Sequence, residues 1–209
     1  MRSRVSSSAA TVGEDGRARP ETRERIVGAA AEVFAEKGYR QSAVDDIVER
    51  SRTSKGSFYH FFPSKEAIFL ALLERLGSLL LARVSGEVER AAGALDRVDA
   101  ALAAALSTLQ EHRTLARILV VEAPALGHGF DARLFALHRR FAAYIASHLD
   151  GAVREGAIPA LDTELAAYAW LGAIHEVVLR WLHTGEREPL AAAIPELRRL
   201  LLRSVGLSS

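Results

Sequence analysis

Apolar residues recur at helical spacing along nearly the whole chain from Glu21 onward. No segment alternates apolar and polar residues in the way that a half-buried strand would. The first repeat is typical, since its apolar residues follow the i, i+4, i+7, i+8 spacing that places them on one face of a helix. These residues are Ile26, Ala30, Val33 and Phe34. The sequence therefore predicts an all-α protein.

Glycines, prolines and capping residues divide this pattern into separate helices. Gly38 provides a left-handed stop for the first helix, Ser54 precedes a short third helix, and Ser64 caps a long fourth helix that runs to about Ala92. The later helices are expected at 96–111, 113–122, 131–155, 162–184 and 190–206, with N-caps at Asp96, Asp131 and Asp162. Pro195 fits the last helix only if residues 190–194 form a separate turn and Pro195 is the first helical residue.

Composition excludes several classes of protein. No apolar run approaches the roughly 18 residues that span a bilayer, and the segment from Met1 to Pro20 has no apolar core of a secretory signal. We therefore expect a cytoplasmic protein without a membrane partner. The chain has no cysteine, which excludes a disulfide framework, a thiolate metal site and a cysteine nucleophile. The formal net charge of +1 decides nothing about partners, because DNA binding needs only a local basic face.

The strongest functional signal lies between Gln41 and Lys65, in QSAVDDIVERSRTSKGSFYHFFPSK. Two short helices joined by a tight turn, with a third helix in front, form a helix-turn-helix, whose second helix enters the major groove of DNA. That helix has only Phe58 and Phe62 on its buried side. Its other positions offer hydroxyls, a cation, an imidazole and an open backbone to phosphates and base edges. The candidate DNA-binding residues of this helix are Thr53, Ser54, Lys55, Gly56, Ser57, Tyr59 and His60.

The stretch that ends its first helix in KGY and continues through SAVDDIVERS and SKGSFYHFFPSKEAIF resembles the DNA-binding signature of the TetR (tetracycline-repressor) family. The resemblance implies that Ser42 and Lys55 reach phosphates, and that Ser57 and His60 face bases. It also implies that Tyr59 contacts the DNA backbone and that Lys65, at the start of the fourth helix, holds a further phosphate.

Two positions depart from the family pattern. Arg52 stands where relatives usually have a turn glycine, so a non-glycine residue is expected in a left-handed conformation at a cost of roughly 1 kcal/mol. Binding of a DNA phosphate by Arg52 would offset that cost, so Arg52 joins the candidate DNA-binding residues. Phe61 stands where relatives often have His or Tyr, so one phosphate donor is missing there.

The segment from Leu165 to Leu182, LAAYAWLGAIHEVVLRWL, is apolar on nearly every side. Such a helix must be buried on every side, so one face is expected to meet a partner. The resemblance implies that this helix and the last one form a four-helix interface in a two-fold homodimer. The expected interface residues are Ile174, Val178, Trp181, Leu197 and Leu201. A monomer with a well-covered core helix is the alternative.

A ligand pocket is expected among the helices between Asp96 and Leu182. On the 131–155 helix an apolar stripe contains two imidazoles, which either touch the polar end of a ligand, respond to pH, or are hydrogen-bonded core histidines. The candidate ligand-binding residues are Glu122, His138, Phe141, Tyr144, Ile145, His148, Tyr168 and Trp170. The C-terminal part is similar in character to the fatty-acid-responsive branch of the family. That similarity implies a small apolar or amphipathic effector, such as a fatty acid or acyl-coenzyme A; no cofactor or metal is expected.

The sequence thus predicts a ligand-responsive transcriptional regulator that binds double-stranded operator DNA, a repressor by family default. Its expected parts are a disordered arm (1–19), a helix-turn-helix domain (20–65) and a ligand-binding and dimerisation domain (66–209). An activator of the same fold is an alternative. A nonspecific architectural DNA-binding protein is another, although such proteins usually carry far more positive charge. An enzyme is disfavoured, because the neighbours His175 and Glu176, and Glu122 near His128, lack metal-ligand spacing, and no phosphate loop or GxSxG motif occurs.

Overall fold

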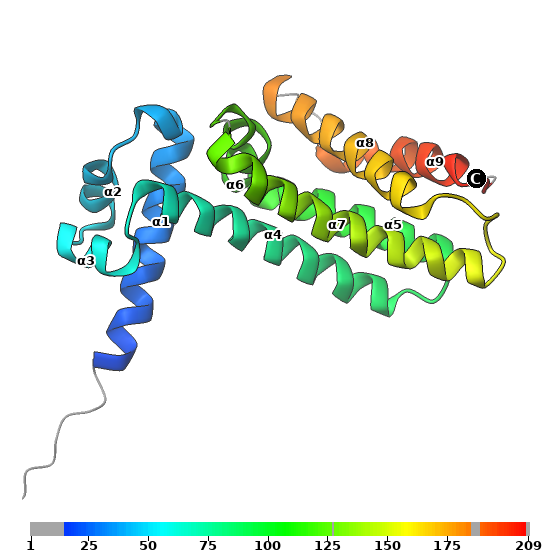
Figure 1. The fold of residues 1–209 in the computed structure, drawn as a ribbon, viewed down its shortest axis with the longest axis horizontal. Coiled ribbons are helices and arrows are strands. Elements are labelled where there is room, and N and C mark those ends of the chain that lie inside the picture. Colours follow the sequence, from blue (N-terminus) through cyan, green and yellow to red (C-terminus); the bar gives the residue numbers. More distant parts are fainter. Residues whose placement is uncertain (1–14, 127, 185–188, 208–209) are drawn as a thin grey trace, which may run out of the picture.

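The computed structural model describes residues 15–126, 128–184 and 189–207, and within these ranges the chain is helical without a strand. The all-α prediction is confirmed. A small body formed by α1, α2 and α3 lies at one end of the molecule, and α4 leaves it to run along a larger body formed by α5 to α9 (Figure 1). No helix in the described ranges is both long and apolar enough to cross a bilayer.

The small body has the three-helix arrangement that the motif predicted. Its helices are α1 (Asp15–Gln41), α2 (Val44–Ser51) and α3 (Lys55–Phe61). They pack around fully buried side chains from each helix, among them Phe34, Ile47 and Phe58. α1 breaks at Gly38, where φ is 75° and ψ is 159°, a backbone conformation open to glycine.

The first helix begins earlier than expected. α1 starts at Asp15, so residues 15–19, which were assigned to a disordered arm, are helical, while residues 1–14 of that arm lie outside the described residues. The expected boundary rested on the absence of an apolar period. A backbone hydrogen-bond ladder needs no such period, which explains the difference.

The larger body contains five further α-helices and several tighter or wider turns among the described residues. They are α5 (Ala94–Glu111), α6 (Arg113–Arg117), the π-helical η1 (Ile118–Glu122), the 3-10 turn η2 (Pro124–Leu126), α7 (His128–Arg154), α8 (Thr163–Thr184), the 3-10 turn η3 (Leu190–Ala193) and α9 (Ile194–Ser204). The prediction for Pro195 holds to within one residue: a separate turn covers residues 190–193, and α9 begins at Ile194 with Pro195 as its second residue.

Several expected caps are confirmed and two are wrong. The side chains of Ser54, Ser64 and Asp162 each accept a backbone N–H from three residues further on, at 3.0, 3.1 and 2.9 Å. Asp96 and Asp131 instead lie inside the first turns of α5 and α7, because these helices begin at Ala94 and His128. A carboxylate in the first turn still stabilises a helix, because it interacts favourably with the positive end of the helix dipole. The aspartates therefore indicated that a helix starts here, but the predicted first residue was wrong.

The helix α4 (Lys65–Arg90) joins the two bodies and has buried side chains along much of its length. Arg75 of α4 pairs with Glu24 of α1, and Glu74 pairs with Arg140 of α7 at 3.0 Å. At Gly77 the helices α4 and α7 are so close that an added Cβ would lie 2.4 Å from a methyl carbon of Leu137. α4 is therefore packed against both bodies and can carry a displacement from one to the other.

Candidate DNA-binding surface and effector cavity

The turn between α2 and α3 adopts the strained geometry that the sequence predicted. Arg52 has φ 52° and ψ 44°, the left-handed conformation, and its backbone N–H donates to the carbonyl of Glu49 at 3.1 Å. Thr53 donates its N–H to the carbonyl of Val48 at 3.2 Å. The guanidinium of Arg52 is exposed, and no ion pair for it occurs among the described residues.

The second short helix, α3, presents a polar face to solvent. Phe58 and Phe62 are buried beneath it, whereas Tyr59 is 54% exposed. The hydroxyls of Ser54 and Ser57 lie 3.0 Å apart at its start, and the space around Gly56 is almost open. The exposed members of the candidate set are Arg52, Ser54, Lys55, Gly56, Tyr59 and His60, with Thr53 and Ser57 half-buried. The surface thus offers hydroxyls and cations that no other segment of the described ranges covers.

The lysine of this face is paired with a carboxylate in the free protein. Lys55 Nζ lies 2.8 Å from a carboxylate oxygen of Asp45 in α2, and this hydrogen bond raises the pKa of Lys55. Both side chains are mostly exposed, so the pair is weak and water screens it. A phosphate can therefore replace Asp45 as the partner of Lys55.

Two expected phosphate ligands, Ser42 and Lys65, are engaged inside the protein. Ser42 is only 4% exposed, and its hydroxyl donates to the carbonyl of Tyr39 at 2.8 Å. Lys65 Nζ donates to the carbonyls of Tyr39 and Ser42, at 2.8 and 2.7 Å. Burial lowers the pKa of Lys65. These contacts hold the α1–α2 connection on the start of α4. They correct the expectation for Ser42, whose hydroxyl faces inward, and leave Lys65 one donor of three for a phosphate.

An aromatic joint, formed by Phe34, Tyr39, Phe69 and Phe130, connects the two bodies. The Tyr39 ring lies 4.7 Å from the Phe69 ring and 5.5 Å from the Phe130 ring, measured between centroids. The sequence did not predict this joint, and Tyr39 entered the sequence analysis only as part of the KGY motif. The position of Tyr39 directly after the helix-breaking Gly38 could have indicated it, because a large ring at a helix end needs packing partners from other elements.

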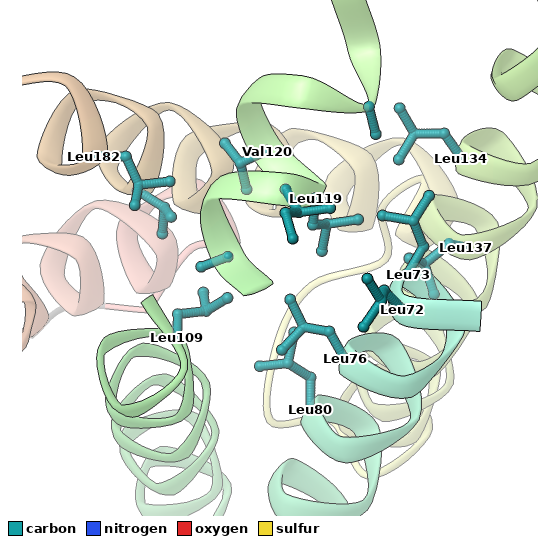
Figure 2. Packing of buried hydrophobic residues seen from close by; sticks show 14 of the residues in the cluster. Leu72, Leu73, Leu76, Leu80, Leu109, Leu119, Val120, Leu134, Leu137 and Leu182 are labelled. Carbon is teal, nitrogen blue, oxygen red and sulfur yellow. The ribbon is translucent and has the colours of Figure 1, made fainter. Parts of the chain in front are cut away.

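The carboxylate of Glu122 completes this joint instead of lining a ligand pocket. Its Oε2 accepts the backbone N–H of Tyr39 at 3.4 Å and lies 3.3 Å from the position that a Cβ on Gly38 would take. Glu122 ends the π-helical turn η1, while Leu119 and Val120 of the same turn point inward among leucines of α4, α5, α7 and α8 (Figure 2). One turn of backbone therefore touches both the core of the larger body and the end of α1.

An apolar cavity of about 410 Å³ lies inside the larger body, between α4, α5, α7 and α8. Six of the expected ligand-binding residues line it, namely His138, Phe141, Tyr144, Ile145, His148 and Trp170. Tyr168, like Glu122, is not part of the wall. Tyr168 lies two residues before Trp170 on α8, and successive helix positions point about 100° apart, so it faces away from the side that Trp170 occupies.

The two ends of the cavity differ in polarity. Near the joint the wall is formed by buried apolar residues, including Leu119, Leu134 and Leu137. At the far end, where α7 ends and α5 begins, the lining residues Arg97, His148 and Arg154 are exposed. Glu155, next to Arg154, also lines this end and is exposed. The cavity thus has a closed apolar end and a solvent-accessible end that is basic on balance, with two arginines and one glutamate.

Two imidazoles of the cavity wall, His138 and His148, have lowered pKa values. Burial lowers the pKa of His138, and the nearby His175 lowers it further. Burial also lowers the pKa of His148, with a smaller effect from the charge of Arg97. Neutral imidazoles can both donate and accept a hydrogen bond, which suits a polar ligand group.

The side chains expected at the dimer interface are instead covered by other helices of the same chain. Val178, Trp181, Leu197 and Leu201 are buried in the single chain, and Ile174, Val178 and Leu201 line the cavity. The reason is that α8 packs against α7, η1 and α9, so most of its apolar surface is already covered. Large apolar side chains that remain exposed on these helices are Leu165 of α8 and Leu200 of α9, at 66% and 64%.

A helix-turn-helix body joined by α4 to a helical body with an internal cavity defines a DNA-binding regulator that carries its own ligand-binding domain. Residues 26–72 match the family described as bacterial regulatory proteins, tetR family. Residues 91–204, more than half of the chain, match the domain described as tetracyclin repressor-like, C-terminal. The chain belongs to the TetR family of bacterial regulators, and it is a transcriptional regulator rather than an enzyme.

Relatives extend over most of the chain. The fatty acid metabolism regulator protein of Bacillus subtilis (strain 168) is 24% identical over 182 residues, which cover 87% of this chain and 94% of the relative. The HTH-type transcriptional repressor DhaR of Mycobacterium sp. (strain GP1) is 30% identical over 193 residues, covering 90% and 96%. The crystal structure of FadR from Bacillus subtilis in complex with stearoyl-CoA has a TM-score of 0.80 at 25% identity, covering 88% of this chain and 98% of that one. The resemblance to the family is confirmed, with fatty-acid regulators among the similar proteins.

Proposed function

We propose that this cytoplasmic protein is a homodimeric repressor that leaves its operator when a fatty acid or acyl-coenzyme A occupies the cavity. The observation that carries the proposal is the cavity itself, which is apolar at its closed end and basic at its accessible end. Two relatives support the functional class: DhaR is named a repressor, and the Bacillus subtilis FadR was solved with stearoyl-CoA.

The polarity of the cavity orients such a ligand. The anionic head lies at the accessible end, beside Arg97 and Arg154, and the acyl chain extends towards Leu134 and Leu137. From Leu134 to Arg154 the helix α7 advances about 30 Å at 1.5 Å per residue, which exceeds the length of a long acyl chain. Burial of that chain against the apolar wall drives binding, and the arginines select the charged end.

On the DNA side, α3 enters the major groove. Ser57 and His60 read base edges, Thr53 lies beside them, and Gly56 allows the backbone to approach. Arg52, Ser54, Lys55 and Tyr59, together with the remaining donor of Lys65, contact phosphates. The absence of acidic residues between Arg50 and Lys65 supports this orientation, because a carboxylate there would repel the DNA.

Dimerisation uses the outer faces of α8 and α9. Leu165 and Leu200 are exposed apolar residues on these helices. The small residues Ala169 and Gly172 are exposed on the same face of α8 as Leu165. A two-fold pair of such faces forms a four-helix interface. The dimer then presents two copies of α3, which on a palindromic operator must lie about 34 Å apart.

The turn η1 transmits ligand binding to the DNA-binding body. Leu119 and Val120 belong to the cavity wall, and Glu122 at the end of the same turn holds the Tyr39 amide. An acyl chain that displaces Leu119 therefore moves the contact on which the end of α1 rests. π-helical turns are uncommon and are often found at functional sites, in agreement with this role.

The test measures operator release directly. A preferred operator is first selected from random duplexes, and its binding is followed by fluorescence anisotropy while stearoyl-CoA or coenzyme A is added. Stearoyl-CoA is expected to weaken operator binding by more than tenfold, whereas coenzyme A without an acyl chain has little effect. Ala101→Trp, which fills the middle of the cavity wall, should abolish the response but keep DNA binding. Release by stearoyl-CoA that is unchanged in Ala101→Trp would show that the ligand acts elsewhere.

A further inference from the structure

Two imidazoles face each other in the inner half of the cavity. His138 of α7 and His175 of α8 both line it, with ring centroids 6.1 Å apart and ring planes at 85°. Neither ring has a hydrogen bond to another group among the described residues. Their neighbours in the wall, including Leu134, Leu137 and Ile174, are apolar. The two imidazoles are therefore polar groups in an otherwise apolar part of the cavity wall.

This pair is separate from the basic end of the cavity. His148 belongs to the accessible end with Arg97 and Arg154, and it lies ten residues after His138 on α7. Ten residues of α-helix advance about 15 Å. An anionic head at the arginines therefore cannot also reach His138, and the acyl chain passes between the histidines.

The side chains of His138 and His175 are both half-buried and have no hydrogen-bond partner within the described chain, so a ligand group that enters the cavity can provide one. A hydroxyl group matches the pair, because it can donate to a ring nitrogen of one imidazole and accept an N–H from the other. A plain methylene chain at this point leaves both rings unpaired or pairs them only with trapped water. The arrangement therefore favours a ligand with an oxygen at this depth.

We propose that His138 and His175 form a second polar subsite, which binds a hydroxyl on the effector chain about a dozen carbon–carbon bonds from the anionic head. The proposal rests on the function proposed above, since it assumes that an acyl chain occupies this cavity. It narrows the effector from long-chain acyl ligands in general to oxygenated ones.

The test compares the binding of three probes by isothermal titration calorimetry: stearate, 12-hydroxystearate and 3-hydroxystearate, in which the carboxylate is the anionic head from which the hydroxyl position is counted. The wild-type dimer is expected to bind 12-hydroxystearate about tenfold more tightly than stearate, as two hydrogen bonds would provide. 3-Hydroxystearate should bind no more tightly than stearate, because its hydroxyl stays near the basic end. His138→Leu and His175→Leu should each remove the preference, and His148→Leu should preserve it.

Three results would overturn the proposal. Equal binding of the three probes to the wild type would mean that water satisfies the pair, while the proposed function would still stand. A preference that persists in both His138→Leu and His175→Leu would place the hydroxyl elsewhere. Absence of binding by all three probes and by stearoyl-CoA would remove the proposed function as well. Thermal melts of each variant identify loss of folding, and since the two histidines lie on different helices, either variant alone decides the result.

Discussion

The carboxylate of Glu122 accepts a hydrogen bond from the backbone amide of Tyr39, 83 residues away in sequence, at 3.4 Å. This contact joins the wall of the effector cavity to the break at the end of α1. Glu122→Ala is expected to keep stearoyl-CoA binding within about threefold, because the carboxylate lies outside the cavity. The same change should reduce ligand-induced release of operator by about tenfold, roughly half of a 3 kcal/mol coupling.

The control for this prediction is Glu111→Ala, which also removes a carboxylate from the larger body; that carboxylate pairs with the exposed Arg83 at 3.6 Å. It should leave release unchanged. If Glu122→Ala responds to the ligand as the wild type does, η1 does not transmit the signal.

Lys65 is expected to act as a structural clamp in addition to any contact with DNA. Lys65→Ala leaves the carbonyls of Tyr39 and Ser42 without their charged donor, so the free energy of unfolding should fall by roughly 1–3 kcal/mol. Urea denaturation of the free protein measures this loss. Lys55→Ala serves as the control, since its exposed pair with Asp45 contributes little to stability. A stability equal to that of wild type in Lys65→Ala would contradict the clamp.

Lys55 and Ser57 should differ in how they affect DNA binding. Lys55→Ala should weaken binding to operator and to random duplex alike, and reduce the slope of log K against log salt by about 0.9. Ser57→Ala should change the preferred base at one or two positions and leave the salt slope unaltered. Salt titrations on both duplexes, with base-substituted operators for Ser57→Ala, separate these effects. Equal losses on both duplexes for Ser57→Ala would remove its base-reading role.

Leu200 and Val178 should respond differently to an added charge. Leu200→Glu places a carboxylate on an exposed face, so it should separate the dimer without unfolding the chain. Val178→Asp buries a carboxylate in the core and should unfold the protein instead. Sedimentation equilibrium with circular dichroism measures both outcomes, and a folded 22.7 kDa monomer is the expected species for Leu200→Glu. A Leu200→Glu variant that stays dimeric would show that the interface lies elsewhere.

Stability should decrease as the pH falls below the ordinary histidine pKa of 6.5, in part through His138. The folded protein binds this proton less readily than the unfolded chain, because burial lowers the pKa of His138. In the pH window between the two pKa values the unfolded state therefore holds more protons, and acid favours unfolding. Denaturation at pH 7.5 and pH 5.5 should show a smaller difference for His138→Gln than for wild type. An identical pH dependence would mean that His138 is not desolvated.

The DNA-binding body, α1 to α3, was predictable from sequence because its caps and apolar spacing are local sequence features. The cap at Ser54 follows from its immediate neighbours, whereas the left-handed conformation of Arg52 followed from the resemblance to a family that usually has glycine there. The cavity-lining residues of α7 were also predictable, since its apolar stripe has one face and the helical period assigns His138 and Ile145 to it.

The remaining assignments depend on contacts that sequence periodicity does not encode. α8 is apolar on nearly all sides, so its pattern could not tell the cavity face of Val178 from the exposed face of Leu165. The π-helical turn η1 shifts the angular spacing of side chains, so Leu119 faces inward and Glu122 reaches the end of α1. The sequence gives no sign that the hydroxyl of Ser42 points inward, because serine side chains are mostly exposed in folded proteins.

If the cavity and the DNA-binding surface are coupled through one protein, binding at one must change the affinity at the other. Thermodynamic linkage requires each ligand to change the affinity for the other by the same factor. The affinity for stearoyl-CoA is therefore measured by calorimetry for the free dimer and for the dimer saturated with operator. We predict that operator weakens stearoyl-CoA binding by the same factor, more than tenfold, by which stearoyl-CoA weakens operator binding. An affinity for stearoyl-CoA that is the same with and without operator would contradict the account.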